Sequence, residues 1–143
     1  MTRARDLADA ADKDFSGTVT VDNITIGGNI SQDSGTVKLD GNFPTGTGNV
    51  ALGDAALDDG SLSGGNNVAI GNTALTADTS GTQNVAVGSS ALAANTTASN
   101  NTALGYLAMG SNTTGASNLA VGSVALDANT TGTNNAAVGF GAL

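Results

Sequence analysis

A nine-residue motif recurs six times between residues 49 and 143, and it constrains the fold more than any other feature of the chain. The motif is Asn-x-Ala-aliphatic-Gly-x-x-Ala-Leu/Met, and its copies start at Asn49, Asn67, Asn84, Asn101, Asn118 and Asn135. The first two starts lie 18 residues apart, and all later spacings are 17. A fixed period this short is the signature of a solenoid, in which each repeat forms one coil and stacking completes the core. We number the positions of each coil from its Asn.

The first five positions of the motif favour a strand that ends at Gly, and the x-Ala-Leu piece predicts a second, shorter strand. The remainder of each repeat, rich in Asn, Thr and Gly, predicts a polar turn. Stacked coils place equal positions about 4.8 Å apart. We therefore expect the Asn side chains of successive coils to form ladders.

Both faces of the expected strand are apolar. Positions two and four point to one side and the invariant Ala at position three points to the other, because strand side chains alternate. Only one side can be the coil interior, and the sequence does not say which. The apolar side chains on the other side of the strand need a packing partner, which predicts self-association about a threefold axis. The residues expected to pack in the core or between subunits are Ala51, Leu52, Ala69, Ile70, Ala86, Val87, Ala103, Leu104, Ala120, Val121, Ala137 and Val138.

Composition argues against several functional classes. The chain has no His or Cys, and its net charge is −8. No Lys or Arg follows residue 48, so we expect no nucleic-acid binding. No apolar run is long enough to span a membrane, so we expect no membrane insertion. Asp58 and Asp59 are neighbours that point apart, and the Asp residues do not follow the Gly-Gly-x-Gly-x-Asp pattern of calcium-binding β-rolls. We expect no enzyme activity, metal site or cofactor.

Three segments follow from these patterns. Residues 1–15 contain the only helix-like stretch, expected to be a short helical or extended anchor that orders against a partner. A frayed terminus is the alternative. Residues 16–48 alternate with a period of two in three short runs, which predicts a β-strand shaft and linker. Residues 49–143 form the six-repeat head. The predicted fold is all-β, with a solenoid of 17-residue coils.

The repeats resemble two related groups of proteins. Asn67-Val-Ala-Ile-Gly-Asn-Thr-Ala-Leu is similar to the head repeat of YadA-like trimeric autotransporter adhesins, and Asn101-Thr-Ala-Leu-Gly-Tyr is similar to repeats of bacteriophage tail fibres. The resemblance covers residues 49–143 and implies a left-handed parallel β-roll assembled as a homotrimer. Residues 22–30 resemble shaft repeats of phage fibres, and residues 2–9 resemble the opening of virion-attached fibre proteins. The N-terminus does not resemble a secretory signal, which favours the phage fibre.

The resemblance implies a structural tail fibre protein of a phage virion, involved in host adhesion at the extracellular face of the host. The expected partners are two further copies of the chain in a homotrimer, other phage tail or baseplate proteins, and a host cell-surface receptor. A polysaccharide is one candidate for that receptor. Virion attachment is expected at Arg3, Arg5, Asp6 and Leu7. Tyr106 and Phe140 stand at position six, where other coils carry polar residues, and are candidate receptor contacts. Packing against a neighbouring coil or subunit is the alternative role for them.

Two other functions are compatible with the sequence. One is the head domain of a bacterial trimeric surface adhesin, which a stalk and membrane anchor in the gene would distinguish. The other is a spacer whose repeats only set the length of a fibre. Deletion of one 17-residue coil distinguishes a spacer from a receptor-binding protein, because a spacer tolerates the deletion and a specific receptor surface does not.

Overall fold

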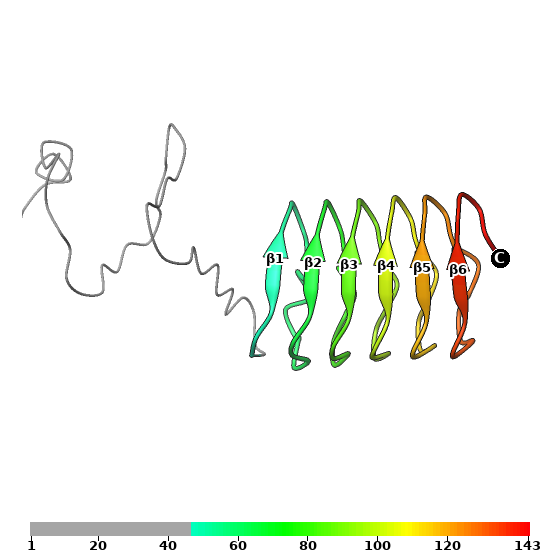
Figure 1. Ribbon diagram of the computed structural model, residues 1–143. Helices are drawn as coiled ribbons and strands as arrows, with labels where there is room; N and C mark the ends of the chain where they lie inside the picture. Colours follow the sequence, from blue (N-terminus) through cyan, green and yellow to red (C-terminus); the bar gives the residue numbers. More distant parts are fainter. Residues whose placement is uncertain (1–46) are drawn as a thin grey trace, which may run out of the picture. The chain divides into compact units, whose positions relative to one another are not determined.

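The computed structural model describes residues 47–143. This part of the chain forms a β-solenoid with one short strand per coil, and it contains no helix (Figure 1). The strands are β1 (Val50–Leu52), β2 (Val68–Ile70), β3 (Val85–Val87), β4 (Thr102–Leu104), β5 (Leu119–Val121) and β6 (Ala136–Val138). The predicted solenoid is therefore confirmed over the six repeats. The expected anchor at 1–15, and all but the last two residues of the expected shaft and linker at 16–48, lie outside the described residues.

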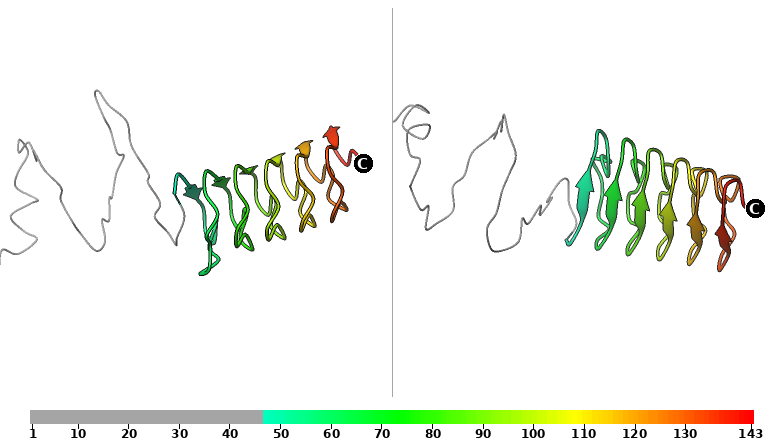
Figure 2. Two further views of the ribbon diagram at one scale, coloured as in Figure 1. Left: turned by 90° about the horizontal axis from the view of Figure 1, so that it is seen from below. Right: turned by 45° about the horizontal axis from the view of Figure 1, so that its top comes forward.

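The six strands make one parallel sheet in sequence order, so each coil pairs only with its neighbours (Figures 1 and 2). The register follows the motif: Ala69 lies beside Ala86, and Ala86 beside Ala103. Every position of the motif therefore forms a column along the solenoid. Because each strand is flanked by the same residue types, one set of contacts is repeated from coil to coil.

Each strand is three residues long, not the five that the motif predicts. The column of position-five glycines ends it, with φ values such as +132° at Gly71 and +137° at Gly88. The prediction of a second strand at x-Ala-Leu is wrong, because residues on both sides of the Ala adopt left-handed backbone, as Thr73 (φ 54°) and Leu75 (φ 52°) do in coil 2. Alternating left-handed residues turn the chain instead of extending it.

Hydrogen bonds to neighbouring coils hold this unusual turn. The Thr73 N–H donates to the Asp54 carbonyl of the preceding coil at 2.9 Å, and the Leu75 N–H donates to the Ala91 carbonyl of the following coil at 3.0 Å. A left-handed L-residue costs about 1–2 kcal/mol. Backbone pairing on both sides offsets that cost, and the pattern recurs at Ser90 and Leu92 in the next coil.

The interior of the solenoid is the alanine side of the strand. Ala69, Ala86, Ala103 and Ala120 are fully buried, and with the Ala and Leu or Met of positions eight and nine they form one continuous core. Small side chains suit this interior, because the coil is too narrow for large residues on both walls. The structure thus answers which strand face is interior: position three points in, and positions two and four point out.

Candidate functional site

The outward strand face is a charge-free aliphatic stripe that runs across all six strands. We call it the outer strand face, and it consists of Val50, Leu52, Val68, Ile70, Val85, Val87, Thr102, Leu104, Leu119, Val121, Ala136 and Val138. Its side chains are half-buried to exposed, with Leu104 at 38% and Val138 at 71% exposure. Five coil steps make it about 24 Å long. Contiguous apolar surface of this kind marks an interaction site more often than a free surface.

The residues predicted to pack in the core or between subunits therefore divide into two sets. The alanines of that group line the coil interior, and their aliphatic neighbours at position four belong to the outer strand face. At the first coil, Ala51 is only partly buried against the core. Within one chain, only the alanine half of the group belongs to the buried core.

The invariant Asn at position one forms the expected ladder inside the solenoid. The Asn67 side-chain oxygen accepts a hydrogen bond from the Asn84 backbone N–H at 2.9 Å. The Asn84 Nδ2 in turn donates to the Ala98 carbonyl at 2.8 Å, which ties the start of its own coil to the end of that coil. The same two bonds recur at Asn101 and Asn118. Each Asn thus links two neighbouring coils and joins the start of its own coil to the end of that coil.

A second ladder, at position twelve, was not predicted from the sequence. The Asn129 Nδ2 donates to the Asn112 Oδ1 at 2.9 Å, and the Asn112 Nδ2 donates to the Asn95 Oδ1 at 3.2 Å. Asn95 and Asn112 are fully buried, although turn residues of this type are usually solvated. The signal that could have revealed the ladder is the recurrence of Asn at 95, 112 and 129. Among the described residues, every buried side-chain polar atom has a hydrogen-bond partner.

Asp78 occupies the first place in this second ladder and is fully buried. Its Oδ1 accepts hydrogen bonds from the Asn95 Nδ2 at 3.1 Å and the Gly81 N–H at 3.0 Å. Burial raises the pKa of the Asp78 carboxyl to about 6, and the nearby negative charge of Asp59 adds to the rise. The two hydrogen bonds act in the opposite direction but do not cancel the effect of burial. A carboxylate is therefore held where three later coils carry a neutral amide.

Because of Asp78, the solenoid should be more stable in weak acid than at neutral pH. The folded pKa, about 6, lies above the unfolded value, 3.8, so the folded chain binds this proton more tightly. The free energy of unfolding should fall by about 3 kcal/mol as pH rises from about 4 to about 6. Asp78→Asn should remove that dependence and raise stability at pH 7, because Asn already fills this place in the three following coils. Urea unfolding followed by circular dichroism from pH 4.5 to 7.5 measures both effects.

The difference between wild type and variant isolates Asp78 from the other carboxylates of the chain. Asp127→Asn is the matched control, because it makes the same chemical change at an exposed residue. An Asp78→Asn profile parallel to that of the wild type would show that this carboxyl does not titrate between pH 4 and 7.

The two candidate receptor-contact residues are exposed. Tyr106 and Phe140 are 56% and 83% exposed, and both stand at position six of their coils, directly after the glycine that ends the strand. The polar residues of the same column, Asn72 and Ser89, are also exposed. The residues expected to attach to the virion, Arg3, Arg5, Asp6 and Leu7, lie outside the described residues.

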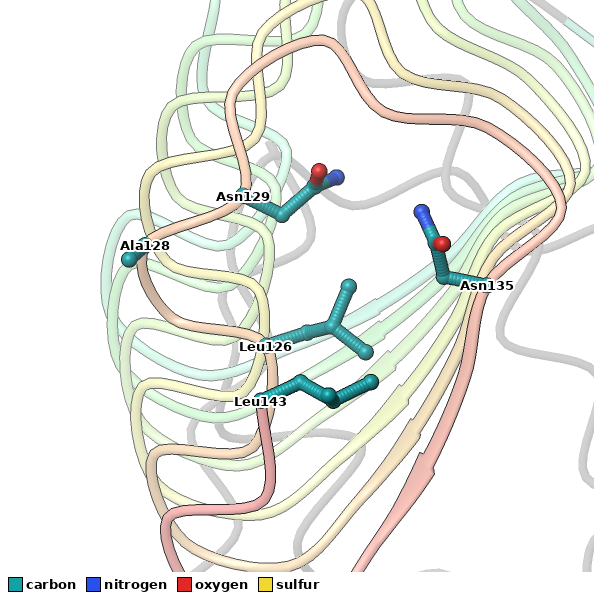
Figure 3. Close-up of a pocket in the computed structure, with 5 residues that line it drawn as sticks. All are labelled: Leu126, Ala128, Asn129, Asn135 and Leu143. Carbon is teal, nitrogen blue, oxygen red and sulfur yellow. The ribbon is translucent and has the colours of Figure 1, made fainter.

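A hollow of about 270 Å³ lies at the C-terminal end of the solenoid (Figure 3). Leu126 and Leu143 lie side by side at it, and the side chains of Asn129 and Asn135 project into it from other parts of the last turn (Figure 3). The two amides are the last members of the two Asn ladders. None of the residues that line the hollow has an ionisable side chain.

The acidic side chains of the described residues are scattered. Residues 47–143 hold no group of three or more His, Cys, Asp or Glu placed to bind a metal ion. Asp59 accepts hydrogen bonds from the backbone and hydroxyl groups of Ser61, which lower its pKa and identify it as part of a local turn. In this same part of the chain, no helix is long and apolar enough to cross a membrane.

Over the described residues, fold and surface define the class of protein as a β-solenoid built from in-register repeats. Comparison of the chain with protein-family models, with curated proteins and with solved structures finds no match.

Proposed function

We propose that this chain is a non-enzymatic structural protein of a phage tail fibre, assembled as a homotrimer and involved in attachment to the host. The phage assignment, the location on the virion and the partners at the tail rest on the sequence resemblance of the repeats and of the N-terminal segments. The proposed mechanism is mechanical and multivalent. Three identical faces on a fibre raise avidity through effective concentration without a strong single contact.

The observation that carries the proposal is the outer strand face. It exposes aliphatic side chains such as Ile70, Leu104 and Leu119, each between 36% and 38% exposed, on six consecutive strands. No residue of this face is charged, so an apolar partner surface would leave no buried charge unpaired. A second and third copy of the chain present the same flat stripe at the same length. Three copies arranged about an axis would cover all three stripes at once.

The interior of the solenoid supports a role as a rigid rod. Two buried amide ladders and the parallel backbone pairing connect every coil to the next. Residues 47–143 contain no Lys or Arg, so this rigidity does not depend on ion pairs. Surface ion pairs weaken as salt rises. Assembly through ladders and apolar contacts would therefore tolerate wide variation in ionic strength outside a cell.

A charge at the centre of the outer strand face tests the proposal. Val87→Asp should dissociate the oligomer, because it places three carboxylates on the covered face. The coil should still fold, since Val87 lies outside its core. Sedimentation velocity measures the oligomer, and circular dichroism measures the fold. Asn100→Asp is the control, because Asn100 is exposed and is not part of the outer strand face. An unchanged oligomer in Val87→Asp would contradict assembly through this face.

A further inference from the structure

Tyr106 and Phe140 are the only aromatic residues between 47 and 143, and both fall in one column of the solenoid. They occupy position six of coils 4 and 6, and Ser123 occupies the same position of the coil between them. Both rings are largely exposed. At interaction sites, exposed aromatic rings supply flat apolar contact area.

The register of the solenoid fixes the spacing of the two rings. The Val124 N–H donates to the Tyr106 carbonyl at 2.8 Å, and the Gly141 N–H donates to the Ser123 carbonyl at 3.0 Å. The position-six residues are thus held coil to coil by backbone hydrogen bonds. Two coil steps separate the attachment points of the rings by about 10 Å. That distance is close to the repeat of two sugar units in an extended 1,4-linked polysaccharide chain.

The surroundings of the column select the charge of the ligand. Asn72, Ser89 and Ser123 stand at the same position of their coils and offer amide and hydroxyl groups for hydrogen bonds to sugar hydroxyls. Residues 47–143 contain no cation, and Asp54 and Asp127 are exposed carboxylates. An anionic polysaccharide would find no cation in this part of the chain and would be repelled by these carboxylates. The column suits a neutral chain.

We propose that the position-six column, from Asn72 to Phe140, binds an extended neutral β-1,4-linked polysaccharide along the solenoid axis. Tyr106 and Phe140 stack on alternate sugar rings, and the serine between them hydrogen-bonds the intervening unit. This inference rests on the proposed function, since it names the chemical class of the host receptor. Each chain of a trimer carries one such column, so weak single columns act together on a polymer.

Titration of the full chain with cellohexaose, fully N-acetylated chitohexaose and β-1,4-mannohexaose, followed by NMR or calorimetry, tests the inference. At least one of these neutral hexasaccharides should bind. Tyr106→Ser or Phe140→Ser, which introduce the residue that coils 3 and 5 already carry, should each weaken binding about tenfold, and the double variant should abolish it. The inference is overturned if none of the three sugars binds, or if the double variant binds as the wild type does.

Two added aromatics test the spacing. Asn72→Tyr places a third ring two coils before Tyr106, which extends the column by one more repeat, and it should strengthen binding of the hexasaccharide that binds the wild type. Ser89→Tyr places a ring only one coil from Tyr106, out of step with alternate sugars, and should not strengthen it. Equal gains in both variants would show that spacing plays no part and would overturn the inference.

Light scattering of the same variants separates this inference from the proposed function. The Tyr106→Ser, Phe140→Ser double variant should keep the oligomeric mass and melting temperature of the wild type. A smaller mass would place the two rings between subunits, which overturns sugar binding and leaves the trimeric fibre standing. A monomeric wild type would overturn the fibre, and the hexasaccharide titration would still decide whether the column binds sugar.

Discussion

Gly88→Ala should unfold most of the solenoid. Gly88 has φ +137°, a conformation that residues with a Cβ rarely adopt, and an added Cβ would lie 2.3 Å from the Gly105 carbonyl oxygen. The backbone cannot move aside, because the Gly88 N–H bonds to Ile70 on one side and the Gly105 N–H bonds to Val87 on the other, each at 2.8 Å. We expect a loss of at least about 3 kcal/mol from backbone strain and overlap together.

Substitutions of two further glycines separate the effect of backbone strain from the effect of steric overlap with the next coil. Gly139 has a similar φ of +127°, but an added Cβ would meet nothing within 4 Å, so Gly139→Ala should show the strain alone. Gly60 has neither a positive φ nor a close neighbour, and Gly60→Ala should be neutral or slightly stabilising. Urea unfolding followed by circular dichroism should rank Gly88→Ala as the least stable and Gly60→Ala as the most stable. Equal stability of all three would contradict the close coil-to-coil contact.

Ala86→Leu should have an effect of similar size through the core. Ala86 is fully buried between Ala69 and Ala103 in the neighbouring strands. Leucine adds three carbon atoms to an interior that already packs against the Ala and Leu of the turn. Overpacking costs about 1–3 kcal/mol where the surroundings can adjust. Here the ladders on both sides restrict adjustment, so we expect a loss at or above the upper end of that range.

Ala136→Leu is the matched control, since it makes the same chemical change at position two of the outer strand face, where the paired residue of the neighbouring strand is already Leu119. It should fold with a stability within about 0.5 kcal/mol of the wild type. Melting temperatures measured on both proteins at the same concentration compare the two faces directly. An Ala86→Leu protein as stable as Ala136→Leu would show that the alanine column is not the coil interior.

The repeat predicted the parts of the fold that depend on periodicity. A fixed 17-residue spacing with Ala at position three is enough to predict one coil per repeat, in-register stacking and an Asn ladder, and the pairing of Ala69 with Ala86 confirms that register. The sequence left open which strand face is interior, since both are apolar. Position three is Ala in every copy, whereas position two is Val, Thr, Leu or Ala. This difference indicates that position three is the more confined site, and the burial of Ala86 and Ala103 explains it.

The turn could not be predicted from residue preferences. Leu75 and Val124 have no tendency toward left-handed backbone, yet both adopt it, with φ of 52° and 53°. Hydrogen bonds between coils decide their conformation, and such bonds exist only once the coils are stacked. The second ladder was missed for a related reason. Asn112 looks like a turn residue in its own coil, and only the stacking of Asn95 below and Asn129 above buries it.

The candidate site was predicted in part. Position six was recognised as the place where Tyr106 and Phe140 replace polar residues, and both proved exposed. Asp78 was seen only as one of several Asp residues, because its burial depends on neighbouring coils that the local sequence does not describe.

The mass of the wild-type protein in solution, measured by light scattering, tests the central claim most directly. If the outer strand face joins three copies, the mass should be about three times 13.7 kDa at micromolar concentration, and it should persist at high salt because the face carries no charge. A stable species of 13.7 kDa would contradict the homotrimeric fibre, since the aliphatic stripe from Val50 to Val138 would then face water in the native protein.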